Sequence, residues 1–231
     1  MRLTHLTACV TLLLAAGQVA AQQRAGDWVS YRDAYRAMVV FEKYGGAKNF
    51  IRSHLQVAPR GKVALDEPLQ LHLSGKSVQI NLPLDPTGRT VFPLLKAAYD
   101  ENAVLVLSHR VGPYSVRPRV SIALRPDSAY DVPELRAACE QALDFGRYVD
   151  PSLHGRNCAG VRFVFAKKGG EAGARLRKDD GAEQALPVAM GVAFAGDVEG
   201  GFPTVTYRFG AGEGTQVVTL NVPLAIVPLF E

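Results

Sequence analysis

The first element that the hydrophobic pattern predicts is an amphipathic helix near the start of the chain. After Asp27, apolar side chains recur at steps of three and four residues, the period of one helix face: Trp28, Tyr31, Tyr35, Met38 and Val39. A pair of glycines at 45–46 ends this helix, and residues 50–57 form an extended segment closed by a Pro-Arg-Gly turn. We therefore expect residues 22–61 to form an N-terminal helix and a lead-in segment.

Further along the chain, the hydrophobic period changes to two, which is typical of a strand with one buried face. Residues 69–73 and 78–82 alternate in this way around a short Gly-Lys link and predict a β-hairpin. Residues 103–107 and 115–124 predict a second hairpin, in which Pro118 indicates an edge strand or a bulge.

A second helix is predicted in the middle of the chain, over residues 131–146. Asp131 is suited to the N-cap and Pro133 to the first turn. One face of this helix is apolar, with Leu135, Ala138, Cys139, Ala142 and Leu143. Residues 167–184 carry four glycines, both charge signs and few apolar anchors, so we expect a flexible surface loop there.

Four more β segments complete the pattern; they begin near Cys158 and at residues 186, 204 and 216. Strands linked by turns, with one helix at the front and one inserted, predict a mainly β (α+β) fold. We expect an antiparallel β-sandwich with an N-terminal helix and one inserted helix, in which residues 62–231 form the sandwich domain.

The first 21 residues have the pattern of a cleavable secretory signal peptide. Arg2 provides a positive start, residues 6–16 are almost free of polar side chains, and small residues precede a predicted cleavage after Ala21. The apolar run is too short to cross a bilayer as a helix. We expect a periplasmic or secreted protein with no transmembrane segment after cleavage. A lipid-attachment site at Cys9 is the weaker alternative, because the apolar stretch continues beyond that cysteine.

The charge composition argues against one class of protein. The chain has 26 basic and 22 acidic side chains, a net charge of +4, and these charges are scattered. This excess does not predict a nucleic-acid-binding protein.

Export removes the chain from the reducing cytosol, and Cys139 and Cys158 are the cysteines left after cleavage. We expect them to form a disulfide that ties the inserted helix to the next strand and contributes roughly 3 kcal/mol of stability.

No recognisable catalytic, nucleotide or metal motif is present. His54, His72, His109 and His154 are not spaced as metal ligands, and neighbouring carboxylates such as Asp100 and Glu101 point in different directions. We therefore predict no metal and no cofactor, and we favour a protein without enzymatic activity.

One polar cluster indicates a ligand. His109, Arg110, Arg117, Arg119 and Arg125 lie on or beside the second predicted hairpin. Arginine forks suit carboxylates and phosphates, so these residues are candidates for binding an anion such as a polysaccharide or a phospholipid headgroup. The alternative, which we favour at this point, is charge on an edge strand that prevents sheets from aggregating.

The sequence thus leaves three functions open. The first is a non-enzymatic binding or interaction module that offers an edge or a loop to a protein partner in the cell envelope. The second is a hydrolase whose site is assembled from dispersed residues. The third is anion binding by the arginine-rich hairpin.

Overall fold

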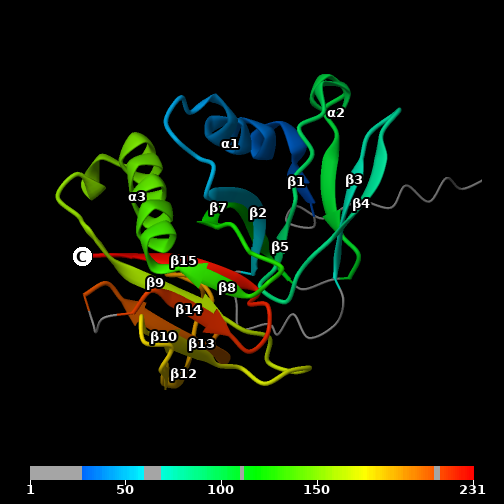
Figure 1. Ribbon diagram of the computed structural model, residues 1–231. Helices are drawn as coiled ribbons and strands as arrows, with labels where there is room; N and C mark the ends of the chain where they lie inside the picture. Colours follow the sequence, from blue (N-terminus) through cyan, green and yellow to red (C-terminus); the bar gives the residue numbers. More distant parts are fainter. Residues whose placement is uncertain (1–27, 60–68, 110–111, 211–213) are drawn as a thin grey trace, which may run out of the picture.

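The computed structural model describes residues 28–59, 69–109, 112–210 and 214–231. The described residues form three antiparallel sheets and three α-helices, so the predicted mainly β, sandwich-like fold with added helices is confirmed (Figure 1). The predicted signal peptide and Arg110 lie outside the described residues.

The largest sheet has seven strands in the spatial order β12-β13-β9-β15-β7-β2-β5. Its strands are β2 (Ile51–Pro59), β5 (Arg89–Thr90), β7 (Tyr114–Ile122), β9 (Cys158–Val164), β12 (Val188–Gly191), β13 (Phe202–Arg208) and β15 (Ala225–Phe230). β2 and β7 pair along their whole lengths. In contrast, β7 and β15 pair only where Ile122 meets Ile226, so the sheet is split between them beyond that point.

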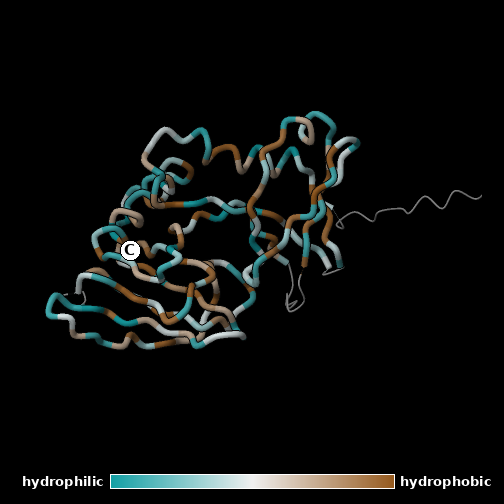
Figure 2. Tube along the Cα trace, turned by 45° about the vertical axis from the view of Figure 1, so that its right-hand side comes forward, coloured by the Kyte–Doolittle hydropathy of each residue, from teal (hydrophilic) through white to brown (hydrophobic). Residues whose placement is uncertain are grey.

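Two four-stranded sheets pack against this central sheet, each on a separate apolar core. The first has the order β1-β6-β3-β4: β1 (Trp28–Ser30), β6 (Val104–Leu107), β3 (Gln70–Ser74) and β4 (Gln79–Pro83). The second has the order β11-β10-β14-β8: β11 (Glu183–Ala185), β10 (Ala174–Arg177), β14 (Gln216–Thr219) and β8 (Ala129–Asp131). Hydrophobic and hydrophilic positions are interspersed along the trace (Figure 2), and they alternate in β3 and β10, whose leucines are buried, as burial of one strand face requires.

The helices are α1 (Tyr31–Lys43), α2 (Lys96–Asp100) and α3 (Val132–Val149), followed by a short 3₁₀ turn, η1 (Pro151–Leu153). α1 begins four residues after Asp27, because residues 28–30 pair with β6 and Ser30 caps the helix through the N–H of Asp33. α1 and α3 lie on the same side of the central sheet (Figure 1), and the rings of Phe41 and Phe145 join them at 5.1 Å.

The predicted disulfide between Cys139 and Cys158 is present. It joins the middle of α3 to the first residue of β9, and the two Cα atoms are 6.0 Å apart. Cys139 is fully buried on the apolar face of α3, as the helical pattern predicts. The disulfide therefore fixes α3 to the central sheet.

The predicted hairpin over residues 103–107 and 115–124 is wrong. Both segments are strands, but β6 pairs with β1 and β3, whereas β7 pairs with β2 and β15. The link between them includes Gly112 at φ 76° and Pro113, and it carries the chain from one sheet to another. A period of two identifies a strand but not its partner.

The loop predicted at residues 167–184 is also partly wrong. β10 lies inside this segment, with Ala174 and Leu176 buried, and it pairs with both β11 and β14. The alternation in Ala-Arg-Leu-Arg is a strand pattern, but it is so short that the surrounding glycines and charges dominate the composition.

Within the described residues, no helix has both the length and the apolar character needed to span a bilayer.

Candidate ligand-binding site

Five polar residues form a belt across one face of the central sheet, on β2, β5 and β7: His54, Gln56, Arg89, Arg117 and Arg119. In the antiparallel register, Gln56 lies opposite Arg117 and His54 lies opposite Arg119. Residues two apart on a strand share a face, so all four side chains lie on the same side of the sheet. Arg89 of β5 is the register partner of Gln56 on its other side. The alternating sequences of β2 and β7 thus concentrate polar groups where a sheet normally buries apolar ones.

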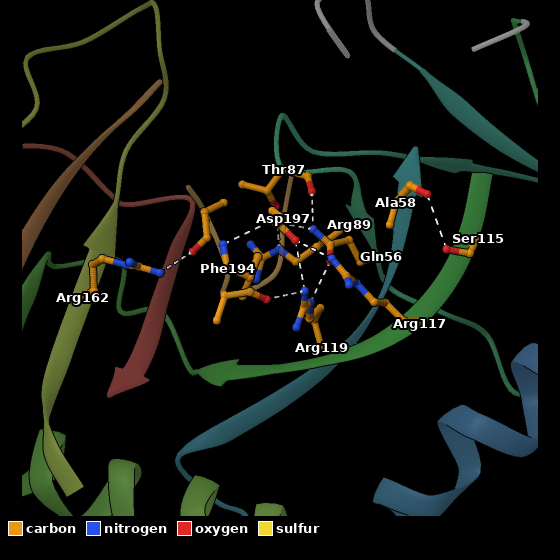
Figure 3. Close-up of polar contacts among 12 residues, drawn as sticks. Gln56, Ala58, Thr87, Arg89, Ser115, Arg117, Arg119, Arg162, Phe194 and Asp197 are labelled. Carbon is orange, nitrogen blue, oxygen red and sulfur yellow. Dashed lines mark hydrogen bonds and ion pairs between the residues drawn. The ribbon is translucent and has the colours of Figure 1, made fainter. Parts of the chain in front are cut away.

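Gln56 is the centre of this belt, and it is only 3% exposed. Its Oε1 accepts hydrogen bonds from the Nε atoms of Arg117 and Arg119, at 3.1 and 2.7 Å. Its Nε2 donates to the carbonyl of Thr87 and to Oδ2 of Asp197. A buried amide with both ends satisfied holds the two guanidinium groups in one fixed orientation (Figure 3).

Asp197 connects a neighbouring loop to the belt. It belongs to the loop of residues 192–201, which joins β12 to β13, and its side chain is 10% exposed. Oδ1 accepts from Nη2 of Arg117 at 2.5 Å and of Arg119 at 3.0 Å, and Oδ2 accepts from the backbone N–H of Phe194. One carboxylate therefore anchors this loop to β7 through charge-assisted hydrogen bonds.

The belt has more positive than negative charge. Arg162 of β9 lies close enough to Asp197 to interact with it electrostatically, and it donates to the carbonyl of Ala193, but its buried Nε has no hydrogen-bond partner among the described residues. Arg117 and Arg119 thus share one carboxylate, and the charge of Arg162 lies nearby. None of the described residues accepts a hydrogen bond from Nη1 of Arg117 or Arg119. Donors remain available for a second anion.

Burial makes the uncompensated positive charge of these arginines less favourable. Desolvation lowers the pKa of Arg119, and the neighbouring charge of Arg117 lowers it further, whereas Asp197 opposes both effects. Desolvation also lowers the pKa of Arg162. Guanidinium groups keep their charge near neutral pH, so these shifts indicate charges that are incompletely compensated.

Arg89 differs from Arg117 and Arg119, because each of its three guanidinium nitrogens already donates a hydrogen bond. Its guanidinium is 4% exposed and binds Oδ2 of Asp85 through Nε and Nη2, at 3.1 and 2.8 Å. Nη1 donates to Ser121, and Nη2 also donates to the carbonyl of Leu224. Arg89 therefore has a structural role: it fixes the turn at residues 85–88 to the sheet.

An apolar groove of about 530 Å³ begins beside the belt, where β7 and β15 separate. Its residues come from α1, α3, both strands and the loop of residues 192–201: Ala37, Val40, Pro118, Arg119, Val120, Ala142, Phe145, Gly146, Val149, Phe194, Ala195, Val227, Pro228 and Phe230. Arg119 is the one charged residue among them. The ring of Phe194 lies 5.3 Å from the Arg119 guanidinium, so the apolar and cationic parts meet there.

The structure unites only part of the predicted anion-binding set. Arg117 and Arg119 lie together, as described. Arg125 instead binds two carboxylates of its own, Asp127 at 3.1 Å and Glu134 at 2.9 Å. His109 follows β6 and contacts the hydroxyl of Ser108.

Other members of the site were not predicted from the sequence. Gln56 has an uncharged side chain within an otherwise ordinary strand, Asp197 lies in a glycine-rich turn, and Arg162 alternates with the buried Val161 and Phe163. The alternation around Arg162 was a usable signal, because a charged residue in the middle strands of a sheet needs a partner.

Among the described residues, neither the buried histidine of β2 nor the acidic side chains form a metal site or a hydrogen-bonded histidine–carboxylate group for acid–base chemistry. The Nδ1 atom of His54 is buried and has no hydrogen-bond partner there. No group of three or more histidine, cysteine, aspartate or glutamate side chains in the described chain is placed to hold a metal ion.

Comparison with known proteins gives no further information. No protein-family model, no curated protein and no solved structure matches this chain. The candidate function therefore depends on the site alone.

Proposed function

We propose that this protein is an exported, non-enzymatic binding protein whose ligand is an amphipathic anion. The alkyl chain of the ligand lies in the groove between α1 and α3, and its anionic head binds Arg119. The observation that carries this proposal is a 530 Å³ apolar groove that ends at a partly buried guanidinium group.

The groove has the properties of a small-molecule site. Typical sites enclose about 300–1,000 Å³ and combine an apolar lining with a few polar groups that fix the orientation of the ligand. Here Val40, Val120, Phe145 and Phe230 provide apolar surface. Two lining residues, Pro118 and Pro228, bring no backbone N–H, which reduces the number of polar groups that an alkyl chain must cover.

Charge complementarity defines the head group. Nη1 of Arg119 is available among the described residues, and Arg117 and Arg162 add positive charge nearby. A carboxylate or phosphate satisfies such donors, whereas a hydroxyl group leaves the charge uncompensated. An uncharged alkyl compound is therefore the poorer ligand.

Export is the second part of this proposal. The signal-peptide pattern of residues 1–21 supports it, and the disulfide is compatible with an oxidising compartment. An amphipathic ligand outside the cytoplasm is consistent with a role in the cell envelope.

Isothermal titration calorimetry with dodecanoate and dodecanol, which share an alkyl chain, tests the ligand class. We expect the purified protein to bind dodecanoate more tightly. Arg119→Gln lowers the dodecanoate affinity about 10- to 100-fold, the range for hydrogen bonds to charged groups, and leaves dodecanol binding unchanged. Ala37→Trp, which fills the groove from α1, weakens both ligands.

Arg125→Gln is the matched control, because Arg125 is equally cationic but lies outside the groove with its own carboxylates. It leaves both affinities unchanged. Equal affinity of the wild-type protein for the two ligands, or no binding of dodecanoate, contradicts the proposal.

A further inference from the structure

The free edge of the central sheet is apolar and exposed. Among the described residues β12 pairs only with β13, and its Val188 and Met190 side chains are 48% and 68% exposed. Residues 185–192 carry no charge. Native proteins protect edge strands with charges, bulges or covering elements, because an open apolar edge pairs readily with another strand.

The opposite edge of the same sheet is protected. β5 is only two residues long, and its Arg89 and Thr90 are 4% and 5% exposed. The contrast shows that the sheet has one edge suited to pairing, and this edge is β12.

The main chain of β12 is directed toward that open side. The N–H of Phe165 donates to the carbonyl of Pro203 at 2.9 Å, so the carbonyl of Pro203 faces β9. Pro203 is the register partner of Met190. In an antiparallel ladder the N–H and C=O of a residue point to the same neighbour and alternate along the strand. Met190 and Val188 therefore direct both groups away from β13.

We propose that two copies of this protein associate through β12, paired antiparallel about a two-fold axis at Ala189. In this register Val188 of one copy lies opposite Met190 of the other, and each pair exchanges both main-chain hydrogen bonds. Ala189 lies opposite its own equivalent. Pro187 lies opposite Gly191, and at this position in the alternation its missing N–H removes no hydrogen bond between the copies.

Self-complementarity favours a second copy over an unrelated strand. A two-fold interface requires each surface to match itself. Here the larger side chains of Val188 and Met190 meet each other, the small ones meet small ones, and the uncharged segment introduces no repulsion between copies. The central sheets of the two copies then become continuous. This association is independent of the ligand proposed for the groove.

Charge substitutions at the paired positions test this register. Val188→Lys/Met190→Lys places like charges opposite each other at both symmetry-related pairs, whereas Val188→Lys/Met190→Glu places opposite charges there. Sedimentation equilibrium over a range of protein concentrations measures the dimer dissociation constant. We expect the wild-type protein to dimerise, the Lys/Lys variant to weaken the dimer at least about tenfold, and the Lys/Glu variant to stay within about threefold of wild type.

Val91→Lys is the control, since Val91 is 73% exposed and lies beside β5 at the other edge. It leaves the dimer unchanged. The proposal is overturned by a wild-type monomer at every concentration, by a dimer that tolerates Lys/Lys, or by equal weakening in both double variants. Circular dichroism confirms folding, and if Lys/Lys does not fold, Met190→Lys alone is measured with the same expected direction.

Discussion

Two walls of the groove are held in place by different forces. The α3 wall contributes Ala142 and Phe145, and the disulfide at Cys139 fixes this helix to β9. The opposite wall contributes Phe194 and Ala195 from the loop of residues 192–201. That loop is anchored to β7 by the carboxylate of Asp197.

This difference indicates which wall responds to a ligand. A disulfide does not depend on salt or on acid, whereas ionic hydrogen bonds are screened by salt and compete with other anions. Oδ1 of Asp197 already accepts from Nη2 of Arg119, beside the Nη1 that the head of the proposed ligand needs. We therefore expect the α3 wall to remain fixed and the loop to adjust when a ligand binds.

Removal of the disulfide has the largest expected effect. The sequence separation of the two cysteines is 19, and loop-closure entropy gives a loss of roughly 3 kcal/mol in the free energy of unfolding for Cys139→Ala/Cys158→Ala. Urea denaturation measures this loss, which we expect to be the same at low and high salt. A loss below about 1 kcal/mol, the scale of an ordinary point substitution, means that packing alone holds the α3 wall.

Substitution of Asp197 has the next largest effect. Asp197→Asn leaves the charges of Arg117 and Arg119 without their carboxylate, and we expect the free energy of unfolding to fall by about 1–3 kcal/mol. The loss is smaller in high salt, unlike that of the disulfide variant. Because the competing carboxylate is removed, the affinity for dodecanoate rises.

Asp127→Asn is the matched control for this prediction. Asp127 binds Arg125 at 3.1 Å, but their side chains are 56% and 42% exposed, so we expect a loss below about 1 kcal/mol. Equal losses in the two variants, measured by the same urea titrations, contradict a special role for the Asp197 contacts.

The two walls also differ in how far the sequence predicts them. The position of α3 and its disulfide follow from local signals: a capping residue, a proline at the first turn, an apolar face and two cysteines. The loop wall depends on which strands are neighbours, and the sequence pattern does not specify this. The misplaced hairpin shows the limit, because the pattern of β6 and β7 is correct but their pairing is not.

The candidate site was partly predictable for the same reason. Arg117 and Arg119 are two residues apart on one strand, so their shared face follows from the period of a strand. Asp197 and Gln56 reach them from distant segments, 80 and 61 residues away from Arg117 along the chain. Arg125 is close to Arg119 in sequence, but it turns away because Asp127 and Glu134 provide nearer partners.

The smallest expected effect concerns acid, and it depends on a buried histidine of β2. His54 lies opposite Arg119 in the sheet, and burial lowers its pKa, with the charge of Arg89 lowering it further. Below the ordinary histidine pKa of about 6.5, the unfolded chain therefore binds a proton that the folded protein resists. Stability falls as the pH drops through this region, and His54→Gln removes that part of the slope. Thermal unfolding between pH 5 and 8 measures the slope in both proteins. His72→Gln is the control, because His72 lies on β3 beside Asn81, away from the loop; a slope reduced equally by both substitutions contradicts the assignment to His54.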